Sequence, residues 1–168
     1  QVRQADADMG LTFSRQPERD IRVEYRQPAP LLAVMRPDHP LARHKSVTLR
    51  AMCAHPLALP MPSTTVRQMI DIACSRQQLP LEPVLTTNHW PTLVGFVDQG
   101  GGLTVAGEVT IRQKVATGSL CGIPIRDHGM ALRDIELQTL AGRTLPHAAQ
   151  RFLDYLKTML PAGQDSSA

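Results

Sequence analysis

The chain has 168 residues, of which 42% are apolar, and its formal net charge is +3. This apolar fraction is enough for a packed core and excludes a disordered chain. The weak, dispersed positive charge and the 4% of aromatic residues argue against a nucleic-acid-binding surface or a base-stacking platform.

Strands and helices are predicted to alternate along the chain, which is typical of an α/β fold. Short apolar runs predict strands at 7–13, 31–35, 56–59, 84–86, 103–106, 121–125 and 135–140. Helices are predicted at 63–77, 91–100, 109–117 and from residue 146 onward. The first of these has the clearest pattern, because its apolar residues recur at i, i+3, i+4 and i+7: Val66, Met69, Ile70 and Ala73.

The number of elements predicts two lobes of unequal completeness. Residues 31–125 supply about five short strands with helices between them, which suits one complete α/β lobe. The flanking segments supply only two or three strands and one good helix, so a lobe built from them is incomplete. We therefore expect the strands at 56–59, 84–86 and 103–106 to share one sheet, separate from the strands at 7–13 and 135–140. We also expect that the chain is a fragment, since no Met begins it, and that in isolation it self-associates, exchanges segments or has a disordered first lobe.

The three cysteines, Cys53, Cys74 and Cys121, are far apart in the sequence and form no CxxC motif. An odd number without such spacing predicts reduced thiols in a cytoplasmic protein. No apolar stretch approaches eighteen residues and the polar beginning lacks a signal peptide, so we expect no association with a membrane.

Enzyme signatures are mostly absent from the sequence. "QGGGL" at 99–103 lacks the lysine of a P-loop and the spacing of a dinucleotide site, and predicts a helix end followed by a tight turn. No GxSxG motif occurs. Cys53 and His55 are two residues apart but no second pair follows at zinc spacing, so we expect no metal and no cofactor.

Two polar segments are candidates for ligand binding. "PMPSTT" at 60–65 leads into the predicted helix, whose free N–H groups and dipole attract a carboxylate or phosphate. The alternative is plain N-capping by Ser63 or Thr64. "TNHWPT" at 87–92 puts polar groups and an aromatic ring after a strand, where ligands of open α/β sheets bind. Simple packing of Trp90 is the alternative there.

An ordered set of motifs covers nearly the whole chain: "DADMGLTF", "PAPLLAVMRPDHPLARHKSVTLRAMCAHPLALP", "STTVRQMIDIAC", "FVDQGGGLTV", "VATGSLCGIPI" and "GRTLPHAAQRFLDYL". In this order and spacing they resemble the effector-binding domain of LysR-type transcriptional regulators. "HPLA" alone is a weak signal, and the ordered set is specific.

The resemblance implies a type 2 periplasmic-binding-protein-like fold, with two Rossmann-like lobes joined by two crossing strands near 27–32 and 124–127. Residues 1–30 and 126–160 would form the first, incomplete lobe, 31–125 the second lobe and 161–168 a tail. The start of the first lobe and the winged helix-turn-helix domain would be absent. The resemblance also implies a small effector, a carboxylate or other anion, bound between the lobes. Further implied partners are copies of the chain, as a dimer or tetramer, and DNA through the absent domain.

The resemblance assigns the effector cleft to strand ends, helix starts and a glycine turn. The implied residues are Thr12, Phe13, Ser14, Arg15, Pro62, Ser63, Thr64, Thr65, Trp90, Thr92, Gly101 and Gly102. Arg15 is the only evident countercharge among them, and a solvated loop arginine is its alternative interpretation. Two other functions remain open from the residues: a stand-alone solute-binding protein, and a small enzyme based on Cys53 and His55.

Overall fold

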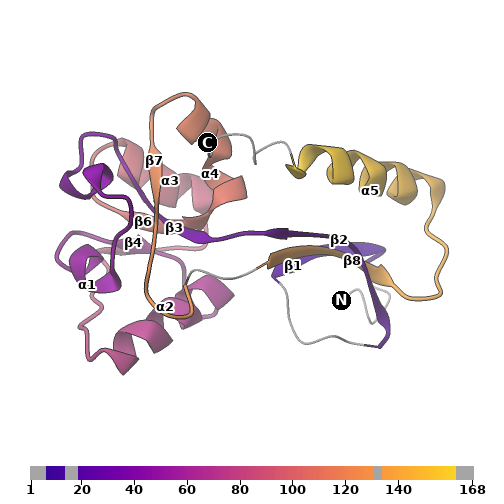
Figure 1. Cartoon of the computed structure of the whole chain (residues 1–168), viewed down its shortest axis with the longest axis horizontal. Helices are drawn as coiled ribbons and strands as arrows, with labels where there is room; N and C mark the ends of the chain where they lie inside the picture. The colour runs from indigo at the N-terminus through magenta and orange to yellow at the C-terminus, as the bar shows by residue number, and fades with distance from the viewer. Residues whose placement is uncertain (1–6, 14–18, 131–133, 162–168) are drawn as a thin grey trace. The chain divides into compact units, whose positions relative to one another are not determined.

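The computed structural model describes residues 7–13, 19–130 and 134–161 (Figure 1). The chain divides into two compact units, one formed by Gln1–Ala29 with Arg133–Ala168 and the other by Pro30–Leu132. We refer to them as unit 1 and unit 2. Each is described by itself below.

Unit 2 contains a three-stranded antiparallel sheet and a two-stranded parallel sheet. Strand β3 (Leu31–Met35) pairs on one side with β6 (Thr104–Gly107) and on the other with β7 (Cys121–Pro124). A parallel bridge between Leu57 and Leu103 joins this sheet to the parallel pair β4 (Ala58–Leu59) and β5 (Leu85–Thr86). The strands predicted at 56–59 and 84–86 therefore pair with each other, whereas the strand predicted at 103–106 belongs to the other sheet and reaches β4 only through this bridge. The expected single sheet is thus found only in part.

Helices cover the strands of unit 2. Its helices are α1 (Leu49–Met52), α2 (Thr65–Arg76), α3 (Trp90–Asp98) and α4 (Glu108–Ala116), with a 3-10 turn at Pro40–Arg43. In Figure 1, α3 and α4 lie on one side of β3 and β6, and α1 and α2 lie on the other. The core on the α3 and α4 side consists of Val34, Val97, Ala106, Ile111 and Leu120, all buried.

The segment after β7 stays with unit 2. Asp127 accepts hydrogen bonds from Leu49 N at 2.8 Å and from Gln77 Nε2 at 2.7 Å, so one carboxylate holds the start of α1 and the end of α2. The second segment of the expected first lobe began at residue 126, whereas residues 126–130 belong to unit 2. The physical reason is this Asp127 network, which no apolar pattern in the sequence signals.

Unit 1 is a three-stranded antiparallel sheet with one helix. Strand β8 (Asp134–Leu140) is central, between β1 (Met9–Phe13) and β2 (Ile21–Pro28). Helix α5 (His147–Met159) runs alongside these strands in Figure 1 and buries Leu153. The sheet is separate from that of unit 2, as expected, but strand β2 was not among the predicted elements.

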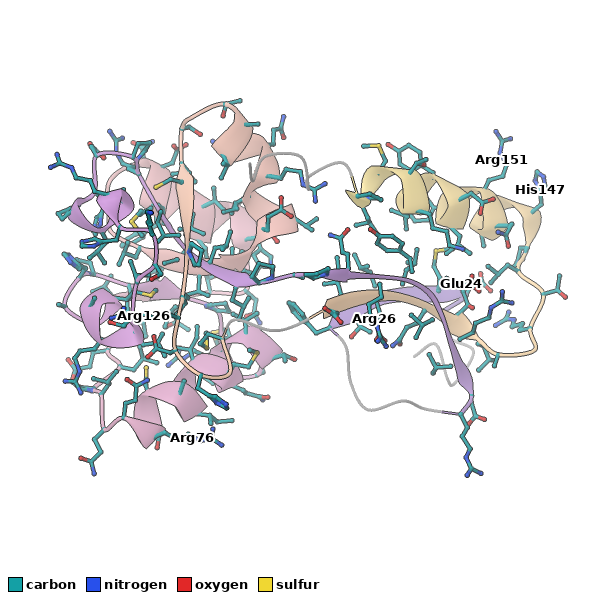
Figure 2. All side chains as sticks on the ribbon, in the orientation of Figure 1. Glu24, Arg26, Arg76, Arg126, His147 and Arg151 are labelled. Atoms are coloured by element: carbon teal, nitrogen blue, oxygen red, sulfur yellow. The ribbon has the colours of Figure 1, made fainter. Side chains whose placement is uncertain are left out.

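Glu24 connects the sheet of unit 1 to α5. It interrupts the pairing of β2 with β8 between Val23 and Tyr25, and Figure 2 shows its side chain between the sheet and the helix. Lys157 Nζ donates to one carboxylate oxygen at 3.1 Å, and Thr139 Oγ1 donates to the other at 3.0 Å. Burial by itself raises the pKa of Glu24, but these two hydrogen bonds and the charges of Lys157 and Arg22 outweigh it. The net effect lowers the pKa below 4.5.

We expect Glu24→Gln to destabilise the chain at neutral pH by about 1–3 kcal/mol, because it removes a charge-assisted contact from a mostly buried site. A carboxylate with a lowered folded pKa stabilises fully above its unfolded pKa, here 4.5, and this stabilisation is lost as the pH falls through the folded pKa. The variant should therefore lose less stability than the wild type on acidification below pH 4.5. Urea unfolding across that range measures both effects. An equal change in the exposed control Glu82→Gln would contradict the assignment.

Candidate functional site

Parallel strands bring two polar loops of unit 2 to one edge of the sheet. Ala58 pairs with Leu85 and Leu59 with Thr86 in parallel register, so both strands end at the same edge. Residues 60–64 lead from β4 into α2, and residues 87–89 lead from β5 into α3. The ends of parallel strands are where open α/β sheets bind ligands.

Two hydrogen bonds hold these loops together. Met61 N donates to Asn88 Oδ1 at 3.0 Å, and Thr87 N donates to Leu59 O at 3.2 Å. Asn88 was not among the residues predicted for the site. The available signal was its position, since an amide directly after a strand end can bond to the neighbouring loop.

Thr64 is the N-cap of α2. Its Oγ1 accepts from Arg67 N at 3.3 Å and donates to Met61 O at 2.9 Å. Capping, one of the two interpretations of this motif, is therefore observed for Thr64. In the described part of the chain, the N–H groups of Thr65 and Val66 have no hydrogen-bond partner, as is usual for the first turn of a helix. Pro62 and Ser63 are exposed beside them.

Arg67, on the first turn of α2, is engaged within unit 2. Its Nε donates to Asp71 at 2.7 Å and its Nη1 to Pro60 O at 3.3 Å, and its side chain is only 11% exposed. The Arg67 charge is thus balanced by Asp71. Any attraction for an anion at this edge comes from the N–H groups and the helix dipole rather than from this arginine.

Trp90 and Thr92 lie at the start of α3 and differ in their surroundings. Trp90 packs against the core cluster that contains Val34, Val97 and Ala106, so the packing interpretation describes its contacts in unit 2. Thr92 is exposed, and its Oγ1 lies 2.8 Å from His89 Nδ1. Thr92 is thus the one of the two that presents a polar group to solvent.

Gly101 and Gly102 lie at the other end of the strands. They precede β6, and Leu103 N donates to Pro56 O at 2.9 Å, at the beginning of β4. The structure therefore does not bring them together with residues 62–65, which follow β4. Their spacing in the sequence suggested a cleft floor, but a turn that precedes a parallel strand opens on the opposite edge from a loop that follows one.

The remaining candidates belong to unit 1. Thr12 and Phe13 are half-buried at the end of β1, opposite Glu136 and Ile135 of β8. Glu136 Oε1 lies 2.5 Å from Nη2 of Arg26, which Figure 2 labels, and its side chain is 3% exposed. Ser14 and Arg15 lie outside the described residues.

An open pocket of about 590 Å³ in unit 1, beside the start of α5, was not predicted. Its lining includes Arg22, Arg143 and His147, the last of which is labelled in Figure 2. Arg22 pairs with Glu24 at 3.2 Å and Arg143 with Asp8 at 3.1 Å. These pairs balance the positive charges locally, so the pocket has no evident preference for anions.

The residues that the structure describes contain neither a cluster of metal ligands nor a membrane-spanning helix. Across 7–13, 19–130 and 134–161, no group of three or more His, Cys, Asp or Glu side chains could hold a metal ion. The rings of His55 and His39 meet edge to face with centroids 4.7 Å apart. Within the same ranges, no helix has the length and apolar character needed to cross a membrane.

Comparison with known proteins gives one family. The model of the LysR substrate binding domain matches residues 1–161. No curated protein sequence matches the chain.

Solved structures of regulators resemble the chain along almost its whole length. The regulatory domain of CcmR from Synechocystis PCC6803, in complex with 2-PG, is 21% identical with a TM-score of 0.69, and the match covers 99% of this chain and 78% of that one. The effector-binding domain of QuiR in complex with shikimate is 18% identical with a TM-score of 0.65, covering 99% and 77%. Full-length HypT from Salmonella typhimurium, a hypochlorite-specific LysR-type regulator, is 16% identical with a TM-score of 0.68, covering 96% and 54%.

These likenesses confirm the expected fold class, the type 2 periplasmic-binding-protein-like fold. The family and the structural relatives are ligand-binding domains of transcriptional regulators and not enzymes. Cys53 and His55 therefore have no support as a catalytic pair.

Proposed function

Because this chain belongs to the LysR substrate-binding domain family, as its motifs predict, we propose that it senses a small anionic effector and thereby controls the DNA binding of a regulator. The observation that carries the proposal is the start of α2. There the N–H groups of Thr65 and Val66 lie beside the exposed Ser63, next to a loop held by Asn88. Such a helix start favours carboxylates and phosphates.

Two of the structural relatives were solved with small molecules bound, which is consistent with a small effector for this chain. The CcmR domain holds 2-PG and the QuiR domain holds shikimate. We propose that the effector of this chain contacts residues 62–65 and Thr92 of unit 2. Gly101 and Gly102 are not part of this proposed site, because they lie at the opposite end of the strands.

The effector would act by favouring one conformation of an oligomer. A dimer or tetramer whose states differ in effector affinity couples that ligand to the DNA-binding domains by about 1–3 kcal/mol. Such a regulator acts on DNA in the cytoplasm. The match to a regulator family favours this function over a stand-alone solute-binding protein.

We expect Ser63→Leu to weaken effector binding at least about tenfold, because a bulky apolar side chain would cover the free N–H groups at the start of α2. Ser63 is a better test position than Thr64, since Thr64→Leu also removes a helix cap and costs about 0.5–2 kcal/mol of stability. The measurement is a thermal-shift titration of the full-length regulator with a panel of small carboxylates that includes shikimate. A bound effector raises the melting temperature in a dose-dependent way.

Ser75→Leu, an exposed serine near the other end of α2, is the matched control and should titrate like the wild type. If Ser63→Leu binds the effector found in the screen as tightly as the wild type does, the start of α2 is only a capped helix end.

A further inference from the structure

Two cysteines that are distant in the sequence meet where α1 ends and α2 approaches its end. Cys53 is the C-cap of α1, and its N–H donates to Leu49 O at 2.8 Å. Cys74 lies in the last turn of α2, where its carbonyl accepts from Gln77 N at 3.1 Å and Leu79 N at 3.0 Å. The two helices contact each other, and each thiol lies close enough to influence the pKa of the other.

Asp127 fixes the spacing of these two helix ends. One of its oxygens accepts from Leu49 N at the start of α1, and the other accepts from Gln77 Nε2 just beyond Cys74. Since α1 has only four residues, fixing its first residue also fixes Cys53 at its end. The proximity of Cys53 to Cys74 is thus supported by the backbone and side-chain hydrogen bonds of these two helix ends.

The two thiols differ in access to solvent. Cys53 is half-buried, whereas Cys74 is 2% exposed. A reagent in solution therefore reaches Cys53 first, and Cys74 is placed to react with whatever forms on Cys53. Burial raises the pKa of Cys53, and burial together with the neighbouring Cys53 raises that of Cys74 to about 12. Both thiols are mostly protonated at neutral pH, so they react slowly there and faster at higher pH.

We propose that Cys53 and Cys74 form an oxidation site that closes to an intramolecular disulfide when the protein meets a small disulfide such as oxidised glutathione. In the first step the Cys53 thiolate attacks the reagent, a mixed disulfide forms, and one glutathione thiolate leaves. In the second step Cys74 loses its proton to solvent and attacks the Cys53 sulfur, and the second glutathione leaves. The two cysteines are oxidised, and the reagent is reduced to two thiols.

The disulfide would connect α1 covalently to α2, the helix whose other end carries Thr64 and Thr65. It would add a covalent bond to the Asp127 hydrogen bonds that already connect these two helices. This site does not depend on the proposed function, because it rests on contacts within unit 2.

Cys121 supplies an internal control. It lies on β7, where its thiol is 3.5 Å from Met35 O, and it is half-buried like Cys53. Burial raises its pKa as well. Cys121 is therefore comparable to Cys53 in exposure but lies apart from the pair.

The test treats the 168-residue Cys121→Ser chain with oxidised glutathione and measures its intact mass after acid quenching and denaturation. We expect the monomer to lose the mass of two hydrogens, with a peptide linking residue 53 to residue 74, and dithiothreitol to reverse the change. The reaction should quicken about tenfold from pH 7 to pH 8, because the thiolate fraction of Cys53 grows by that factor. The Cys121→Ser, Cys74→Ala double variant should instead keep a glutathione on Cys53.

A chain that retains two alkylatable thiols, stops at the mixed disulfide or forms only intermolecular links would overturn the proposal. Melting curves of the reduced variants verify that they are folded. If the double variant unfolds, Cys74→Ser replaces Cys74→Ala and the same glutathione adduct is expected.

Discussion

Gly102→Ala is expected to destabilise the chain by about 3 kcal/mol or more. Gly102 has a φ of +141°, and a Cβ atom added there would overlap the carbonyl oxygen of Pro56. That oxygen also accepts from Leu103 N, a bond that joins β4 to β6. The substitution therefore combines backbone strain of about 1–3 kcal/mol with a steric overlap that costs a similar amount.

Two other glycines of unit 2 distinguish the backbone strain from the steric overlap. Gly118 has a φ of +72° and no atom within 4 Å of an added Cβ, so Gly118→Ala should cost only the strain, about 1 kcal/mol. Gly95 lies inside α3 with equally open surroundings, so Gly95→Ala should stabilise by about 0.5–1 kcal/mol. Urea unfolding measures the free energy of unfolding of the three variants. If Gly102→Ala lowers it no more than Gly118→Ala does, the predicted overlap with Pro56 is wrong.

At the glycine turn, loss of stability and loss of effector contact can be confused in a Gly102→Ala variant. Loss of effector response in Gly102→Ala would accompany loss of stability, and would not indicate contact with the effector. The sequence alone could not distinguish the two, because "QGGGL" is compatible with both a ligand loop and a tight turn. The edge of the sheet at which the turn lies is a property of the strand pairing, which the local sequence does not encode.

Elements with a regular apolar stripe were predictable to within about two residues. Helix α2 was predicted at 63–77 and extends from Thr65 to Arg76, with Val66, Met69, Ile70 and Ala73 buried as the stripe indicates. Strand β3 matches its prediction at both ends, since its apolar run is buried on both faces.

Strand β2 was missed although its first residues alternate apolar and charged side chains. Ile21, Val23 and Tyr25 alternate with Arg22, Glu24 and Arg26, which is a strand pattern. The strand pairs irregularly between Val23 and Tyr25, and Glu24 is mostly buried by Lys157 and Thr139 rather than solvated. Glu24 and Arg26 thus pair with residues more than a hundred positions away, which no local pattern reveals.

The candidate site was predictable only in part, because some of its features follow from local sequence and others depend on residues far apart in the chain. The start of α2 follows from a local signal, hydroxyl side chains before an apolar stripe, and Thr64 is its cap. The bond from Met61 N to Asn88 joins loops 27 residues apart and depends on the parallel pairing of β4 with β5. The sequence indicates which polar residues can bind a ligand, whereas the pairing of β4 with β5 determines which of them lie close together.

The exposed apolar surface of unit 1 predicts that the 168-residue chain self-associates in solution. Phe152, Tyr155 and Met159 of α5 are 54%, 55% and 49% exposed, and they recur at i, i+3 and i+7 on one side of the helix. Leu153, which is 1% exposed, faces the other way. On β1, Leu11 is 51% exposed. Because these side chains are already about half buried, covering each of them is worth about 1 kcal/mol, and together they favour association.

Unpaired strand edges in unit 1 also favour self-association. Among the described residues, β1 and β2 each pair with β8 alone, so each has one edge available to another chain. We expect light scattering after gel filtration to give a mass of at least a dimer instead of 18.5 kDa.

The double variant Phe152→Glu, Met159→Glu should shift the mass towards the monomer, because charges on the stripe oppose its burial. Ile72→Glu, at a residue of α2 that is 54% exposed, should leave the mass unchanged. A clean monomer in the unmodified chain would mean that neither the α5 stripe nor the edges of this sheet suffice for association.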